Sequence, residues 1–218
     1  MEAHIVWDWN GTLLDDVHVS LEATNRALRK VNVPSLSVKE YKENYCVPVH
    51  DFYQKILSRT PTEYEWKVIG QEFNTYYKPV ILTASLSNGA KEIIQRRESQ
   101  SVCSLMEHHL LEEMLSTFKI DHFFNLVQGR MVALSREGKK NHLEQHIQSL
   151  SSKHHLSKDQ IVLVGDANDD AEAARSLGIA SILYSGGTHS YDRLKNVGVP
   201  VANTLQKAIE YADNMVNR

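Results

Sequence analysis

The chain has 218 residues, of which 42% are hydrophobic and 23% charged, a composition typical of one or two globular domains. Its 24 Lys and Arg residues and 27 Asp and Glu residues give a net charge of −3, without the basic excess that a nucleic-acid-coating protein needs. No run of about 20 apolar residues is present, so the sequence predicts no transmembrane helix.

The strands of a buried parallel sheet are predicted by short apolar runs rich in β-branched residues. In chain order these runs cover residues 4–7, 101–104, 123–127, 161–164, 180–184 and, as a short edge strand, 199–202. Helical patterns occupy residues 89–97, 107–118, 140–150, 170–177 and 205–217. The alternation predicts an α/β fold with a Rossmann-like parallel sheet, helices on both faces and right-handed crossovers.

One region after the first strand shows helical patterns only, which three prolines divide into three or four helices. We therefore expect an α/β core domain of residues 1–16 and 80–218 and an inserted all-helical cap domain of residues 17–79. Most aromatic side chains of the insertion are expected to form its own core, and some are candidates to face a substrate pocket.

The N-terminus and the two cysteines predict a cytoplasmic protein. The first residues lack the basic start and long apolar run of a secretory signal. Cys46 and Cys103 belong to no CxxC motif, so a disulfide framework is not expected. Cys103 lies in a predicted core strand and is interpreted as a buried, inert thiol.

Polar residues follow the predicted strands, at the edge where an open parallel sheet binds ligands. Two carboxylates there repel each other unless a cation lies between them, and hard oxygen ligands prefer Mg²⁺. Asp8 and Asp166, each at a strand end, are therefore expected to share Mg²⁺. Backbone N–H groups of Gly11 and Thr12 are candidates to hold phosphate oxygens, and Asp8 is a candidate nucleophile that forms an aspartyl-phosphate.

The order and spacing of these residues resemble the haloacid dehalogenase-like (HAD) hydrolases. Asp8-x-Asn10-Gly11-Thr12-Leu13-x-Asp15 resembles the family's first motif, usually DxDGTxxD, and Gly165-Asp166-x-x-x-Asp170 matches the fourth. Ser104 at a strand end resembles the second motif, and Lys139 before a helix resembles the third, with Lys140 as the less favoured alternative. The helical insertion after the first motif resembles the C1-capped members, which include phosphoglycolate phosphatase-like proteins.

This resemblance implies a role for each matching residue. Asp8 would attack phosphorus, and the side chains of Asp8 and Asp166 with the main-chain carbonyl of Asn10 would hold Mg²⁺. Asp170 would support the metal site. The acidic fourth motif points away from carbon–halogen cleavage, which the same family carries out without Mg²⁺. The other matching residues would bind the oxygens of the phosphoryl group that is transferred: Gly11, Thr12, Ser104 and Lys139.

Residue 10 departs from the family pattern, because phosphatases of this family have a second Asp there. That Asp protonates the leaving oxygen and then activates water, and the Asn10 amide does neither. General acid–base help is worth about 10²–10⁴ in rate. Three interpretations stay open: a slow or specialised phosphatase for activated esters, a phosphate binder without turnover, or a substitution made to trap a complex. Asp15 and Asp16 are expected to brace the loop and not to replace the acid.

Other motifs are given structural interpretations. His142 and His146 have zinc-ligand spacing but lack the HExxH pattern, and we interpret them as solvated surface residues. Asn10-Gly11-Thr12 fits a glycosylation sequon, which requires secretion and is therefore not expected to be used. Gly186-Gly187-Thr188 is interpreted as a loop at the rim of the site.

The sequence thus predicts a Mg²⁺-dependent phosphatase of the HAD type that acts on a small phosphorylated metabolite through an aspartyl-phosphate. The alternative is a noncatalytic phosphate-binding or regulatory protein, which Asn10 favours. A phosphotransferase or phosphomutase would also need the missing acid. Neither a nucleic acid nor a membrane is expected as a partner, a monomer and a homodimer are both open, and the insertion does not identify the substrate.

Overall fold

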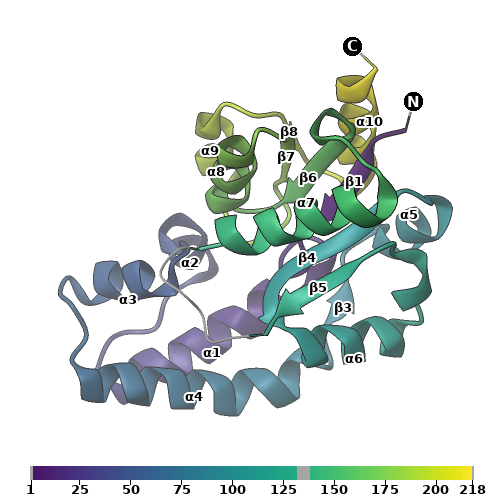
Figure 1. The fold of residues 1–218 in the computed structure, drawn as a ribbon. Helices are drawn as coiled ribbons and strands as arrows, with labels where there is room; N and C mark the ends of the chain where they lie inside the picture. Colours follow the sequence, from purple (N-terminus) through teal and green to yellow (C-terminus); the bar gives the residue numbers. More distant parts are fainter. Residues whose placement is uncertain (1, 132–137, 218) are drawn as a thin grey trace.

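A six-stranded sheet in the order β5-β4-β1-β6-β7-β8 forms the centre of the computed structural model, which describes residues 2–131 and 138–217 (Figure 1). Every neighbouring pair of strands is parallel. A separate antiparallel pair joins β2 (Leu14–Asp15) to β3 (Ser85–Leu86). The strands of the main sheet are β1 (His4–Trp7), β4 (Gln100–Glu107), β5 (Val127–Arg130), β6 (Ile161–Gly165), β7 (Ala180–Tyr184) and β8 (Val201–Ala202).

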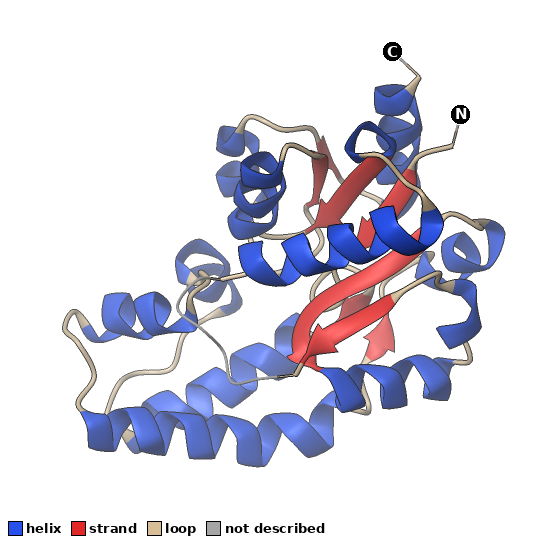
Figure 2. Ribbon diagram, in the orientation of Figure 1, coloured by secondary structure: helices blue, strands red, loops and turns tan. Residues whose placement is uncertain are grey.

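Helices cover both faces of the main sheet (Figure 2). Because successive side chains of a strand point to opposite faces, Ile5 and Trp7 of β1 belong to one hydrophobic cluster and Val6 to the other. The predicted α/β class, with a Rossmann-like sheet between two helical layers, is confirmed. One layer contains α5 (Ala90–Arg96), α6 (His108–Phe118) and α10 (Leu205–Val216), and the other contains α7 (Lys140–His154) and α8 (Asn168–Leu177).

Four helices lie between β2 and β3 in the chain, and this fully described segment contains no strand. The arrowheads of β4 and β5 point toward these helices in Figure 1, so the helices lie beyond the carboxyl ends of the sheet. They share a hydrophobic cluster in which Tyr41, Phe52 and Tyr53 are almost fully buried. Across the described residues, no helix is long and apolar enough to cross a membrane. The four helices are α1 (Val17–Lys30), α2 (Val38–Asn44), α3 (Val49–Leu57) and α4 (Glu63–Ile81).

The predicted strands differ most from the observed ones at β5 and β4. The prediction of a strand over residues 123–127 is wrong, because Asp121–Phe123 form a 3₁₀-helix and β5 begins only at Val127. Phe123 packs against the first hydrophobic cluster, so its apolar character reflects burial and not a strand. β4 continues to Glu107, three residues beyond the predicted end, and Cys103 within it is a buried free thiol, as expected.

His146 corrects the interpretation of the histidines as solvated. His146 belongs to α7, and its buried ring contacts β4 and β5, with Nε2 2.9 Å from the Ser101 hydroxyl and Nδ1 3.0 Å from Oε1 of Gln128. The buried His4 ring lies 2.9 Å from the same hydroxyl, and His142 is half-buried. Because hydrogen bonds replace the lost water contacts, these polar rings are accommodated in the interior. Burial lowers the pKa of His146 to about 3 and that of His4 to about 4.

The two buried histidines should make folding stability depend on pH. Their folded-state pKa values lie below the unfolded value near 6.5, so below pH 6.5 the unfolded chain binds protons that the folded chain does not. The free energy of unfolding is therefore at its full value above pH 6.5 and falls as pH drops below it. Each should reduce the free energy of unfolding by about 2 kcal/mol between pH 7 and pH 5. Urea unfolding across this range should show a smaller pH dependence in His146→Gln than in the wild type. The exposed-site variant His109→Gln should keep the wild-type dependence, and an unchanged dependence in His146→Gln would contradict the assignment.

Candidate active site

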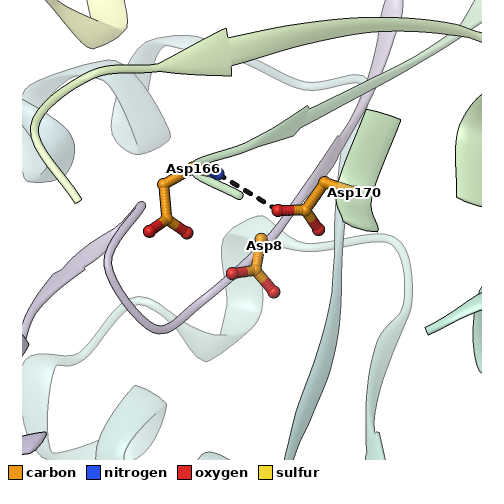
Figure 3. A group of neighbouring side chains, drawn as sticks. All are labelled: Asp8, Asp166 and Asp170. Carbon is orange, nitrogen blue, oxygen red and sulfur yellow. Dashed lines mark hydrogen bonds between the residues drawn. The ribbon is translucent and has the colours of Figure 1, made fainter. Parts of the chain in front are cut away.

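Three aspartates lie side by side at the carboxyl ends of β1 and β6 (Figure 3). Asp8 directly follows β1, Asp166 directly follows β6, and Asp170 lies in the first turn of α8. One oxygen of each carboxylate lies within 4.8 Å of the others. The adjacency follows from the topology, because β1 and β6 are neighbours in the sheet and their ends meet at one edge.

Asp170 is fixed by the loop that precedes α8. Its Oδ2 accepts the backbone N–H groups of Asp166 and Ala167, both at 3.1 Å. A side chain at Gly165 would collide with the Asp170 carboxylate, so the last residue of β6 has to be small. With Oδ2 bound to the backbone, Oδ1 is the oxygen that faces the other site residues.

Lys139 is the lysine that reaches this cluster. Its Nζ lies 2.5 Å from Asp8 Oδ1 and 2.6 Å from Asp170 Oδ1, and the residue is 3% exposed, whereas Lys140 faces solvent. Burial lowers the pKa of Lys139, but Asp170 and Asp8 outweigh this effect and hold the pKa well above its usual value. Burial raises the pKa of Asp8 to about 8, against the opposing effect of Lys139 and with the help of Asp170 and Asp166.

The donor set fits a hard divalent cation. Three carboxylates with one ammonium group leave an excess of negative charge in a buried place, where unpaired charge is costly. The grouped donors are carboxylate oxygen atoms, the ligands that Mg²⁺ prefers. The cluster therefore suits Mg²⁺ better than it suits zinc, which favours nitrogen and sulfur ligands.

Asp166 is held by residues of two loops, one after β1 and one after β7. Its Oδ2 accepts the backbone N–H of Thr188 at 2.5 Å and the Thr188 hydroxyl at 2.6 Å, and Oδ1 accepts the Thr12 hydroxyl at 3.2 Å. A side chain at Gly11, which has a φ of +72°, or at Gly187 would collide with Asp166. The loop expected at the rim therefore supports Asp166 directly, a role that its Gly-Gly-Thr sequence did not reveal.

The N–H groups proposed to hold phosphate are used within the first loop instead. Gly11 N–H donates to Asp16 Oδ1 at 2.8 Å, and Thr12 N–H donates to the carbonyl of Trp9 at 3.3 Å. Since each N–H group already has an acceptor, this arrangement leaves neither free for a phosphate oxygen. Asp16 braces the loop, as the sequence indicated, whereas Asp15 is exposed.

Asn10 is surrounded by polar groups from three segments. Its Nδ2 donates to Asp16 Oδ2 at 2.8 Å and to the Tyr77 hydroxyl at 2.9 Å. The Ser104 hydroxyl, at the edge of the same site, lies 3.5 Å from Asn10 Oδ1 and accepts the N–H of Met106 at 3.1 Å. Tyr77 comes from α4 and was not predicted, because its place here depends on how that helix packs.

Comparison with known proteins identifies the family. A family model described as "Haloacid dehalogenase-like hydrolase" matches residues 5–184. The chain belongs to the haloacid dehalogenase-like hydrolases. A phosphoglycolate phosphatase of Vibrio cholerae serotype O1 is 26% identical over 210 residues, which cover 91% of this chain and 88% of the relative.

Solved structures share the HAD fold along almost the whole chain. One from Clostridium acetobutylicum, described as a predicted phosphatase, has a TM-score of 0.78 at 18% identity and covers 97% of this chain and 98% of its own. A protein tyrosine kinase A of Mycobacterium tuberculosis has a TM-score of 0.77 at 19% identity, with 97% and 98% covered. One of these proteins is described as a phosphatase and the other as a kinase, so the shared fold does not by itself identify the reaction.

The helical insertion contributes to the surroundings of the HAD site. Arg193 in α9 (Tyr191–Leu194) donates from Nη1 to the carbonyls of Lys42 at 2.7 Å and Tyr45 at 2.8 Å, and so ties the core to the end of α2. A cavity of about 240 Å³ opens beside Lys139. It is lined by Val47, Pro48, Gly138, Lys139, Lys140, Asp169, Glu172, Ala173 and Ser176.

Proposed function

We propose that this chain is a Mg²⁺-dependent phosphatase that acts on a small phosphorylated metabolite through an aspartyl-phosphate. The observation that carries the proposal is the buried group of Asp8, Asp166 and Asp170, two of which contact Lys139. Membership of the HAD hydrolases and the likeness to the Vibrio cholerae phosphoglycolate phosphatase support it.

In this proposal, Asp8 is the nucleophile and attacks phosphorus. Mg²⁺, which Asp8, Asp166 and the main-chain carbonyl of Asn10 would hold with support from Asp170, would neutralise charge on the phosphoryl oxygens. Lys139 and Ser104 bind the same oxygens and orient the phosphoryl group for in-line attack. The Ser104 hydroxyl accepts the Met106 N–H and donates to Asn10 Oδ1 over a long 3.5 Å contact, and a phosphoryl oxygen would replace Asn10 as the acceptor of this hydrogen.

We also propose that residues 17–79 act as a cap over a core formed by residues 1–16 and 80–218. The separate hydrophobic cluster of the four helices and their place beyond the carboxyl ends of the strands support this division. A cap in this place excludes water from the phosphoryl group and shapes the choice of substrate. α4 runs on to Ile81, so the boundary near residue 80 falls in its last turn.

A noncatalytic phosphate-binding protein is the second candidate, and Asn10 is the observation that favours it. The amide supplies no proton to a leaving group, and both of its hydrogens already have acceptors, Asp16 and Tyr77. An enzyme with this loop therefore lacks acid–base help both for expulsion of a poor leaving group and for attack of water on the aspartyl-phosphate, and only the first of these steps depends on the ester. An active enzyme should prefer acyl and aryl phosphates to alkyl phosphates.

A turnover screen with and without Mg²⁺ separates the two candidates. We expect phosphate release from p-nitrophenyl phosphate or acetyl phosphate in the presence of Mg²⁺, and loss of that release in EDTA. Alkyl esters such as β-glycerophosphate should react about 10²-fold or more slowly. Binding of inorganic phosphate by calorimetry, without turnover of any ester, would instead establish the noncatalytic protein.

A further inference from the structure

The buried carboxylate of the first loop is that of Asp16, which lies beside the Asn10 amide. Asp16 is 1% exposed, and its Oδ2 lies 2.8 Å from Asn10 Nδ2. We propose that Asn10 and Asp16 form a coupled amide–carboxylate pair, in which Asp16 and Tyr77 are positioning residues that orient the Asn10 amide, so that the two residues can be exchanged together but not singly. This inference rests on the proposed phosphatase function for its kinetic consequences only.

The hydrogen bonds around residue 16 require an acceptor at both side-chain oxygens. Oδ1 accepts the N–H of Gly11 at 2.8 Å, while Oδ2 accepts from Asn10 and, at 3.2 Å, from the Ser20 hydroxyl. A carboxylate satisfies both positions, whereas an asparagine would present its NH₂ group to one of two N–H donors. Since the site is buried, such a donor–donor contact leaves hydrogen bonds unmade and is destabilising.

The same contacts explain why residue 10 is an amide. An aspartate at position 10 beside Asp16 would place two carboxylates in hydrogen-bond contact in a buried site, where like charges repel strongly. If both residues are exchanged, the asparagine at position 16 accepts the Gly11 N–H with its Oδ1 and donates from Nδ2 to the aspartate at position 10. The exchange keeps the total charge and reverses the hydrogen bond between the two side chains, while the Ser20 and Tyr77 hydroxyls, which both donate and accept, reorient to match.

Tyr77 is able to serve either arrangement. Its hydroxyl accepts from Asn10 Nδ2 at 2.9 Å and lies 3.4 Å from Asp16 Oδ2, to which it donates. A hydroxyl rotates freely and both donates and accepts, so in the exchanged pair it would accept from residue 16 and donate to residue 10. Because Tyr77 belongs to α4, it also joins the helical insertion to the loop that carries Asp8.

The pair has a consequence for the reaction. Asp16 and Tyr77 take both hydrogens of the Asn10 amide, so its Oδ1 is the atom turned toward Ser104. The loop therefore offers a leaving group an acceptor and no proton. Exchange of the two residues would place a carboxyl group at position 10, the acid–base position of the family's phosphatases, and leave a neutral partner at position 16.

Four chains test the inference: wild type, Asn10→Asp, Asp16→Asn and the double exchange. We expect each single variant to lower the Tm in EDTA by about 5–10 °C, and the double exchange to melt within about 3 °C of the wild type. On β-glycerophosphate with Mg²⁺, kcat of the double exchange should exceed that of Asn10→Asp by at least about tenfold. Asp15→Asn, a change at an exposed carboxylate of the same loop, should leave the Tm unchanged.

The thermal measurement is independent of the proposed function. If no chain hydrolyses any ester but the double exchange restores the Tm, the pairing stands and the phosphatase proposal fails. If the single variants do not fold, the double exchange alone tests the inference. Two independent destabilising changes would add and leave the double exchange unfolded as well, whereas a coupled pair predicts that it folds. The inference would be overturned if Asn10→Asp were as stable as the wild type, or if the double exchange were less stable than either single variant.

Discussion

Asp8→Asn is expected to abolish ester hydrolysis, with a fall in kcat of about 10⁴-fold or more, while the protein keeps its fold. The substitution keeps the size of the side chain and an oxygen that accepts from Lys139, but an amide does not act as the nucleophile. Because the phosphoryl-binding groups on Lys139 and Ser104 remain, binding of inorganic phosphate should persist. Steady-state kinetics with p-nitrophenyl phosphate and Mg²⁺, together with phosphate calorimetry, measure the two effects.

Asp15→Asn is the matched control for this prediction. It removes the same charge from the same loop at an exposed position on β2, away from the three-aspartate cluster. We expect its kcat to stay within about twofold of the wild type. An Asp8→Asn variant that keeps more than about one hundredth of wild-type turnover would show that the nucleophile is another group.

The convergence of Asp8 and Asp166 is predictable from the sequence, because it needs only local signals and sheet topology. Each residue directly follows a short apolar strand, and strands that alternate with helices are parallel, so their carboxyl ends meet at one edge. Ser104 was expected at a strand end by the same reasoning, but β4 continues to Glu107, so Ser104 approaches Asn10 from within a strand beside β1. The spacing of Lys139 before its helix was sufficient to prefer it to Lys140.

The supporting contacts were less accessible to sequence reasoning, because they depend on packing between distant segments. Tyr77 reaches Asn10 only through the placement of α4, 67 residues away along the chain. Thr188 supports Asp166 from a loop whose glycines are equally typical of an ordinary turn. His146 looked solvated because polarity alone predicts exposure, whereas a tertiary hydrogen bond to Ser101 makes its burial possible.

Lys139→Met is expected to damage both stability and turnover. Methionine fills a similar volume but removes the only ammonium group that contacts Asp8 and Asp170 in the described part of the chain. The three remaining carboxylates then share a buried site without a compensating protein charge, which should cost about 3–5 kcal/mol of unfolding free energy in EDTA. The value of kcat/KM should fall by about 10²–10⁴, because one group that binds the phosphoryl oxygens is lost.

Mg²⁺ should reveal the electrostatic origin of this loss. A divalent cation neutralises more of the excess negative charge when the lysine is absent, so added Mg²⁺ should raise the Tm of Lys139→Met by more than it raises that of the wild type. Lys140→Met is the matched control, because it removes the same charge from the next residue, which faces solvent. Its kinetics and its Mg²⁺ response should be those of the wild type. Equal Mg²⁺ responses in Lys139→Met and Lys140→Met would mean that Lys139 does not balance the three carboxylates.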